Sequence, residues 1–129
     1  MTLKVLVVDD NQDAAFSAAE LLENAQCEVR VYHDGPTAIV EARDFCPDVC
    51  VLDLTMPRMD GAELAERLLE QAGNPLRIIA LTGRWDITST HQTRNAGFEE
   101  HLVKPVDPDH FIKTVTGKKP PIKVGIPPV

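Results

Sequence analysis

The sequence predicts one α/β domain in which a parallel sheet has helices on both of its faces. Short runs rich in Val, Ile and Leu alternate along residues 3–116 with longer segments whose apolar residues recur at helical spacing. The run 49–52 is apolar throughout and lies between Pro47 and Pro57, as expected of a strand buried on both faces. Acidic or polar residues end several of these runs, at the sheet edge where open α/β sheets bind ligands.

Five strands are predicted, and each is followed by a segment with a helical pattern. The predicted strands are residues 3–8, 28–32, 49–52, 76–81 and 100–103, and the predicted helices are residues 11–25, 36–45, 62–72, 85–96 and 108–116. Strand 28–32 alternates polar and apolar residues, so we expect it to be more exposed than the others. Helix 85–96 contains four Thr and Ser residues, which predicts a weak and mobile helix. Gly73 and Gly117 are expected to end the helices that precede them.

This alternation of strands and helices implies right-handed crossovers and a single doubly wound parallel sheet. The length of the chain suits the flavodoxin-like strand order 2-1-3-4-5. In that order the carboxyl ends of four neighbouring strands carry Asp9 and Asp10, Asp53, Thr82 and Lys104. We therefore expect these five side chains to lie close together.

The composition is that of an ordinary globular domain, and the charge is unevenly distributed. The 129 residues are 43% hydrophobic and 26% charged, with a net charge of −7. Residues 117–129 hold three lysines and no acid, so subtracting their charge leaves −10 on residues 1–116. An acidic body argues against direct binding of nucleic acid.

The sequence predicts a cytoplasmic protein that does not enter a membrane. No apolar run has the length of a membrane span, and the amino terminus lacks the layout of a signal peptide. The three cysteines are odd in number and do not suggest a disulfide framework, which fits a reducing compartment.

Three carboxylates, from Asp9, Asp10 and Asp53, are predicted to meet at the carboxyl edge of the sheet. At separations of about 5 Å and an effective dielectric constant of ~20, each pair repels by roughly 3 kcal/mol. Such a pocket either raises carboxyl pKa values or holds a cation. Several carboxylates with open positions for water suit Mg²⁺, or Mn²⁺ in its place. The sequence therefore predicts a magnesium site formed by these acids.

The same edge has the groups needed to receive a phosphoryl group. With a metal bound, Asp53 can act as a nucleophile and form an aspartyl phosphate. Lys104 offers a compact positive charge to one phosphoryl oxygen, and the hydroxyl of Thr82 offers a hydrogen bond to another. Gly83, which has no side chain, leaves room for the arriving group.

Several residues of reactive type have simpler structural interpretations. Asp10 or Asn11 could cap the helix that follows, although the predicted convergence of acids and lysine favours the functional interpretation. Cys46 and Cys50 have a Cys-x₃-Cys spacing, but one is predicted to end a helix and the other to lie inside a strand. We interpret them as buried thiols rather than as a metal or redox pair. The remaining histidines, expected to be solvated, are His33, His91 and His110.

Motifs at the predicted strand ends resemble those of one known family. They are Asp9-Asp10, Asp53 followed by Met56-Pro57 and Asp60-Gly61, Ala80-Leu81-Thr82-Gly83, and Lys104-Pro105. In this order they resemble the receiver domain of two-component response regulators, over residues 3 to about 116. The resemblance implies that a histidine kinase or a histidine phosphotransfer protein donates a phosphoryl group to Asp53.

The resemblance also implies how the remaining residues of the site act. Asp10 and Asp53 would bind Mg²⁺ directly, Asp9 would act through water, and the backbone carbonyl of Thr55 would complete the protein ligands. The peptide bond between Lys104 and Pro105 would be cis.

A conformational switch follows from the same resemblance. In receivers, phosphorylation draws a hydroxyl, here that of Thr82, toward the phosphoryl group, and an aromatic residue on the fifth strand follows. His101 occupies that position instead of the usual Tyr or Phe. The face formed by the fourth helix, fifth strand and fifth helix would change, and a homodimer through this face is one assembly that the resemblance allows.

The sequence therefore predicts a phosphorylation-controlled signalling domain rather than a turnover enzyme. It could be a single-domain regulator or the receiver of a hybrid histidine kinase. One alternative is a Mg²⁺-dependent phosphohydrolase of small phosphate esters, but such enzymes need a general-acid carboxylate two residues after the nucleophile, where this chain has Thr55. A second alternative, a docking module independent of phosphorylation, is favoured only by His101.

Residues 1–116 are predicted to form the receiver domain, and residues 117–129 a flexible basic tail rich in proline. A polyproline helix that docks on an aromatic groove is the alternative for this tail. The partner that receives the output signal is not identified by the sequence.

Overall fold

The structure is a computed structural model, and it describes residues 2–54, 56, 60–73, 75–83 and 97–117. The strands are β1 (Lys4–Val8), β2 (Glu28–Tyr32), β3 (Val49–Asp53), β4 (Arg77–Thr82) and β5 (Glu100–Val103). The helices are α1 (Gln12–Asn24), α2 (Gly35–Phe45), α3 (Gly61–Gln71) and α5 (Pro108–Thr116). The helix predicted over residues 85–96 and the tail 118–129 lie outside the described residues.

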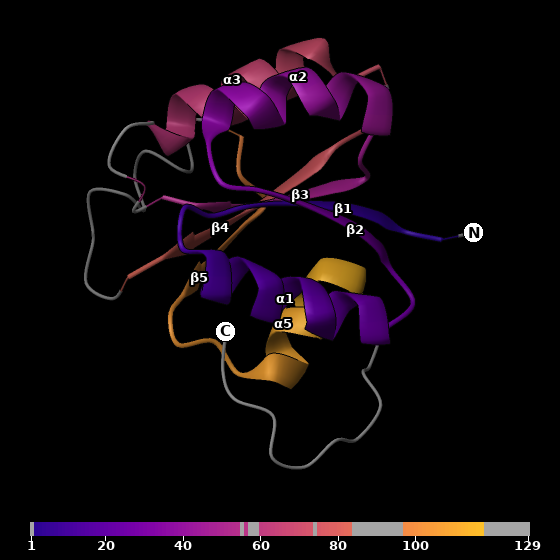
Figure 1. The fold of residues 1–129 in the computed structure, drawn as a ribbon, viewed down its shortest axis with the longest axis vertical. Helices are drawn as coiled ribbons and strands as arrows, with labels where there is room; N and C mark the ends of the chain where they lie inside the picture. Colours follow the sequence, from indigo (N-terminus) through magenta and orange to yellow (C-terminus); the bar gives the residue numbers. More distant parts are fainter. Residues whose placement is uncertain (1, 55, 57–59, 74, 84–96, 118–129) are drawn as a thin grey trace.

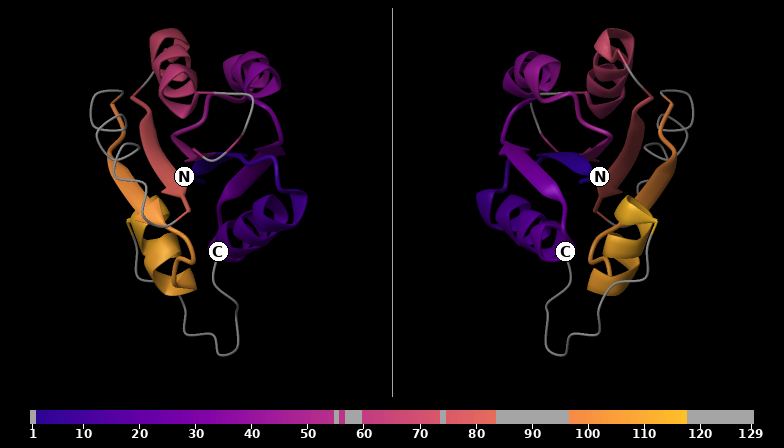
Figure 2. Two further views of the ribbon diagram at one scale, coloured as in Figure 1. Left: turned by 90° about the vertical axis from the view of Figure 1, so that its left-hand side faces the viewer. Right: turned by 90° about the vertical axis from the view of Figure 1, so that its right-hand side faces the viewer.

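All five strands are parallel and form one sheet in the order β2-β1-β3-β4-β5, which confirms the predicted topology. Helices α2 and α3 cover one face of the sheet, and α1 and α5 cover the other (Figures 1 and 2). None of the described helices is both long enough and apolar enough to cross a membrane.

The two faces of the sheet have separate apolar cores, because alternate residues of a strand point to opposite faces. Along β1, Val5 and Val7 belong to the core beneath α1 and α5, whereas Leu6 and Val8 belong to the core beneath α2 and α3. Every residue of β3 is buried, which confirms the prediction of a strand covered on both sides. Strand β2 is partly exposed along its length, as predicted, and forms one edge of the sheet.

Polar side chains cap the amino termini of the described helices. The Oδ1 atom of Asn11 accepts a hydrogen bond from the backbone N–H of Ala14 at 3.1 Å, so Asn11 and not Asp10 caps α1. Asp34 caps α2 through Thr37, whose backbone N–H and hydroxyl both donate to it and lower the pKa of Asp34. The capping alternative for Asp10 is therefore wrong.

Two details of the helix ends differ from the predictions. Gly73 does not end α3 in a left-handed conformation: the helix stops at Gln71, and Ala72 is already extended, with φ −67° and ψ 128°. Because the extended backbone of Ala72 already ends the helix, no left-handed residue is needed there. Gly117 ends α5 with φ 72°, as predicted.

The thiol of Cys46 is exposed, so the prediction that it fills core volume is wrong. Cys46 does end a helix, as expected, because it is the left-handed cap of α2, with φ 52°. At this helix end the thiol donates to the backbone carbonyl of Arg43 at 3.4 Å and stays at the surface. Cys50, inside β3, is buried as predicted, and this burial raises the pKa of its thiol to about 12.

Arg77, at the start of β4, connects the sheet to the carboxyl end of α5 by hydrogen bonds. Its Nη1 and Nη2 atoms donate to the backbone carbonyls of Val115 and Thr114 at 2.9 and 2.8 Å. Its Nε atom lies 2.7 Å from a carboxylate oxygen of Glu99. A cation is favoured at this end of a helix because the unpaired carbonyls carry partial negative charge.

We predict that Arg77→Met lowers the free energy of unfolding by about 1–2 kcal/mol, measured by urea denaturation. Three hydrogen bonds to a charged group are lost, but the partial exposure of the site reduces the cost. Arg67→Met is the matched control, because Arg67 forms an exposed ion pair with Glu63 one helical turn away, and we expect a change below about 0.5 kcal/mol. Equal effects of the two substitutions would contradict this account of Arg77.

Candidate functional site

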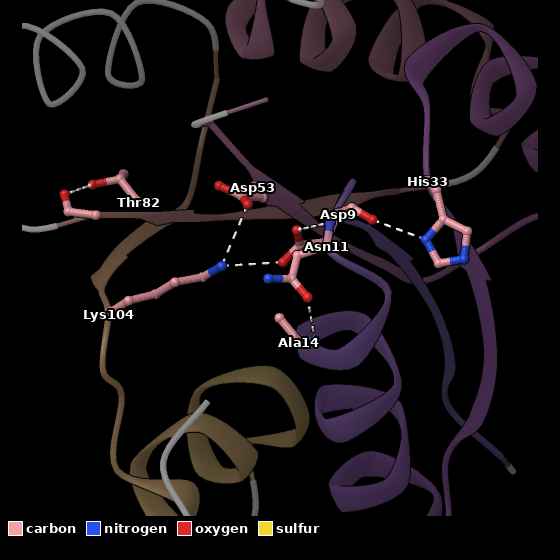
Figure 3. A network of polar contacts seen from close by, with 8 residues as sticks. Asp9, Asn11, Ala14, His33, Asp53, Thr82 and Lys104 are labelled. Atoms are coloured by element: carbon pink, nitrogen blue, oxygen red, sulfur yellow. Dashed lines mark hydrogen bonds and ion pairs between the residues drawn. The ribbon is translucent and has the colours of Figure 1, made fainter. Parts of the chain in front are cut away.

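Asp9, Asp53 and Lys104 meet at the carboxyl edge of the sheet (Figure 3). Asp9 directly follows β1, Asp53 is the last residue of β3, and Lys104 directly follows β5. These elements are neighbours only in the folded sheet, since Lys104 comes 95 residues after Asp9. The convergence expected from the strand order is therefore confirmed for these three residues.

Lys104 lies between the two buried carboxylates. Its Nζ atom is 3.1 Å from Oδ2 of Asp9 and 3.3 Å from Oδ2 of Asp53. Its backbone N–H donates to the carbonyl of Thr82 at 2.8 Å, which aligns the residue with the end of β4. The peptide bond between Lys104 and Pro105 is cis, as predicted.

Burial dominates the electrostatics of Asp9. Its side chain is only 4% exposed. Burial raises the pKa of the Asp9 carboxyl, the adjacent Asp53 raises it further, and hydrogen bonds from the backbone of Asn11 and from Lys104 oppose the rise. The net effect is a raised pKa, so an ionised Asp9 in this pocket is less stable than one in water.

The pKa of Lys104 shifts in the direction that keeps its charge. Burial alone would lower this pKa, but the charges of Asp53 and Asp9 and the hydrogen bonds to them outweigh burial and raise it. The ammonium therefore remains in the pocket at neutral pH and compensates part of the carboxylate charge.

The carboxylates of Asp9, Asp10 and Asp53 could hold a metal ion. One oxygen atom from each residue lies within 4.8 Å of the others, and Asp10 is exposed whereas Asp9 and Asp53 are buried. An all-oxygen group of three carboxylates, open to water on the side of Asp10, fits the ligand preference of Mg²⁺. Thr55, predicted to supply a backbone carbonyl, lies outside the described residues.

Thr82 is placed at the site, but its hydroxyl points away from Asp53. The hydroxyl donates to the backbone carbonyl of the next residue, Gly83 (Figure 3). A move of this hydroxyl toward Asp53 would therefore require that hydrogen bond to break.

His101 lies in β5, one strand beyond Thr82. It is paired in register with Ala80 of β4, and its side chain is half-buried. The next residue, Leu102, belongs to the core beneath α1 and α5. Because strand side chains alternate, His101 is on the other face of the sheet.

One contact of the site was not anticipated. His33 was expected to be solvated, but its Nδ1 atom lies 3.0 Å from the backbone carbonyl oxygen of Asp9. Its ring also meets the ring of Phe16 edge-on, with the centroids 5.6 Å apart. A signal was present in the sequence: His33 directly follows the second predicted strand, at the same edge as the acids. His110 is exposed, as expected, and His91 lies outside the described residues.

The sheet order and the acid–lysine cluster define a flavodoxin-like domain with a candidate metal-dependent phosphoryl site. The sequence matches the response regulator receiver domain over residues 5–116. The chain therefore belongs to the family of response regulator receiver domains, which are signalling proteins and not, in general, turnover enzymes.

Curated relatives and solved structures agree with this assignment. Response regulator MprA of Mycobacterium bovis is 35% identical over 105 residues, which are 81% of this chain and 45% of that protein. The chain thus spans about half the length of the curated relatives it matches.

Chemotaxis response regulator CheY4 of Vibrio cholerae has a TM-score of 0.78 and 30% identity, with 88% of this chain and 96% of that chain covered. A CheY-like receiver domain protein from Methanospirillum hungatei has a TM-score of 0.84 over 91% of this chain and 93% of that one. Its identity of 22% supports the fold alone.

We predict that Asp9→Asn stabilises the metal-free protein at pH 7 by about 1 kcal/mol, because it removes a buried charge beside Asp53. The raised pKa means that ionisation of Asp9 opposes folding. In the wild type, ionisation of Asp9 begins to lower the free energy of unfolding as pH rises past the unfolded-state pKa of about 3.8. The full reduction is reached above the raised folded-state pKa. The advantage of Asp9→Asn should therefore shrink between pH 7 and pH 4 in thermal melts.

Asp10→Asn is the matched comparison for this prediction. Asp10 is exposed, so its carboxylate keeps most of its hydration and its replacement should change stability less. An Asp9→Asn protein that is no more stable than the wild type at pH 7 without metal would contradict the electrostatic account.

Proposed function

We propose that this receiver domain accepts a phosphoryl group on Asp53 and that the modification controls its signalling surface. The observation that carries the proposal is the contact of Lys104 Nζ with Asp9 and Asp53 at 3.1 and 3.3 Å, with both carboxylates buried. This arrangement brings a fixed positive charge to the carboxylate that would receive the phosphoryl group.

In the proposed reaction a carboxylate oxygen of Asp53 attacks the phosphorus of a phosphohistidine on a donor protein. An O–P bond forms as the N–P bond breaks, and the electron pair of the broken bond remains on the imidazole nitrogen. Lys104 would then pair with an oxygen of the transferred group. The reaction needs charge neutralisation and positioning, and no proton relay within this chain.

Asp10 and Asp53 are the proposed direct ligands of Mg²⁺, and Mn²⁺ could replace it. Asp10 is exposed, which leaves it accessible to a hydrated ion. Asp9 is buried and already paired with Lys104, which supports a role through water; the backbone carbonyl of Thr55 is the further proposed ligand. A bound ion would supply positive charge to the carboxylates and to the phosphoryl oxygens.

The proposed switch starts from the hydrogen bond between Thr82 and Gly83. When Asp53 is phosphorylated, the Thr82 hydroxyl would leave the Gly83 carbonyl and donate to the phosphoryl group, beside which Gly83 leaves space. His101, on the neighbouring strand, would follow and alter the surface at β5.

The proposed donor is a histidine kinase or a histidine phosphotransfer protein, because response regulators interact with histidine kinases. We place the transfer in the cytoplasm, where the ATP that charges such a kinase is available. The family match ends at residue 116 and α5 ends at Thr116. We therefore propose residues 1–116 as the receiver and residues 117–129 as a separate extension.

The first test is the intact-protein mass after incubation with acetyl phosphate, with and without Mg²⁺. We expect a Mg²⁺-dependent gain of one phosphoryl group, about 80 Da, in the wild type and no gain in Asp53→Asn. Lys104→Met should accept phosphate at least about tenfold more slowly, because one charge that stabilises the transition state is lost.

A gain of mass that persists in Asp53→Asn would contradict the assignment of the phosphoacceptor. No gain in the wild type with either acetyl phosphate or a phosphorylated histidine phosphotransfer protein would contradict the proposed function. Continuous hydrolysis of a small phosphate ester would instead support the phosphohydrolase alternative.

A second prediction separates phosphate acceptance from the switch. Thr82→Ala should still gain about 80 Da, because Thr82 is not the nucleophile, but phosphorylation should no longer shift the NMR signals of the His101 imidazole. Thr37→Ala, which removes a hydroxyl on α2, is the control and should leave that response intact. A normal His101 response in Thr82→Ala would contradict the proposed role of the hydroxyl.

A further inference from the structure

The contact between His33 and the backbone of Asp9 has a defined direction. Nδ1 of His33 lies 3.0 Å from the Asp9 carbonyl oxygen (Figure 3). A carbonyl oxygen can only accept a hydrogen bond, so the contact requires the hydrogen atom to be on Nδ1. The imidazole is therefore held in one orientation and, when neutral, in one tautomer.

This hydrogen bond continues the pairing of β1 with β2 beyond the last residues of the two strands. The final pair is Val8 with Tyr32, and the N–H of Asp9 still donates to the Tyr32 carbonyl at 3.1 Å. In a continued parallel ladder, the Asp9 carbonyl would next accept from the backbone N–H of Asp34. Asp34 instead caps α2, and the side chain of His33 donates in its place.

Phe16 of α1 supports the imidazole from the side. The two rings meet edge-on at an angle of 84°, a favourable arrangement for aromatic rings. Phe16 is 55% exposed although it is large and apolar. Its ring contact with His33 gives this exposed side chain a structural role at the same edge of the sheet as the acids.

The peptide group that His33 contacts joins Asp9 to Asp10, two of the three candidate metal ligands. Both backbone groups of Asp9 are thus held from the end of β2, the N–H by Tyr32 and the carbonyl by His33. The Asp9 side chain is held as well, because its Oδ1 atom accepts from the N–H of Asn11 at 3.0 Å. Fixing this peptide plane limits the positions from which Asp10 can present its carboxylate.

We propose that His33 is a positioning residue, which orients the Asp9–Asp10 peptide for binding of a divalent cation. The inference rests on the proposed function of the acidic cluster. It adds to that cluster a residue that is not itself a metal ligand and that acts through the backbone. Groups that orient metal ligands commonly change metal affinity by about 10–100-fold when removed. Because His33 acts one peptide bond away from the carboxylates, we expect an effect near the lower end of this range.

The test is calorimetric titration of Mg²⁺ into wild-type protein and two variants. His33→Ala removes the donor, and we expect Mg²⁺ to bind about tenfold more weakly. His33→Asn restores a donor, because the side-chain amide of Asn can reach the same carbonyl as Nδ1 does, and its affinity should be within about twofold of the wild type. His110→Ala, which removes an exposed histidine of α5, is the control and should bind normally.

A purely structural role of His33 would lower the melting temperature of the metal-free protein without changing Mg²⁺ affinity. Normal affinity in His33→Ala, or an affinity in His33→Asn as weak as that of His33→Ala, would overturn the inference. A wild type that does not bind Mg²⁺ would overturn the proposed metal site and this inference with it. Failure of the proposed metal site is therefore distinguishable from failure of the role of His33 alone.

A measurement on the wild type covers the case in which His33→Ala fails to fold. Nitrogen-15 NMR of the neutral imidazole should show the hydrogen atom of His33 on Nδ1, as the contact with the Asp9 carbonyl requires. A neutral ring with its hydrogen atom on Nε2 alone would overturn the inference without any substitution.

Discussion

The ammonium group of Lys104 makes it possible to bury two neighbouring carboxylates at one edge of the sheet. Without a compensating cation, desolvation of Asp9 and Asp53 and their mutual repulsion would both destabilise the folded protein. The lysine reaches them from the strand end beyond β4, so the pocket exists only when β1, β3 and β5 are in their correct places. The site is in this sense a product of the whole sheet rather than of any local motif. Its remaining excess of negative charge is what suits it to a divalent cation.

The three acids differ in burial, although all of them lie at the carboxyl ends of strands. Asp9 and Asp53 are inside and contact the lysine, whereas Asp10 faces water. An incoming hydrated ion would therefore meet Asp10 before the others. The division depends on Asn11, which caps α1 and leaves the carboxylate of Asp10 available. If α1 began one residue earlier, Asp10 would be its cap.

The strand order and the meeting of Asp53 with Lys104 could be predicted because buried runs and their final residues are local features of the sequence. The direction of the Thr82 hydroxyl could not be predicted, because its acceptor, the carbonyl of Gly83, is positioned only by the folded backbone. The hydrogen bond of His33 could not be predicted for a related reason, because its acceptor is the backbone carbonyl of Asp9, just past the end of another strand. The prediction that Gly73 ends α3 was wrong because glycine permits a left-handed turn without requiring one.

The exposed thiol of Cys46 gives the natural chain a place to attach a spectroscopic probe. The other two cysteines are buried, so a maleimide dye should react first at Cys46 in the folded protein. Cys46 precedes β3 and Asp53 ends it, and the first and last residues of this five-residue strand are about 13 Å apart. A dye at Cys46 would therefore leave the acidic pocket uncovered, and it could report binding events there without any engineered cysteine.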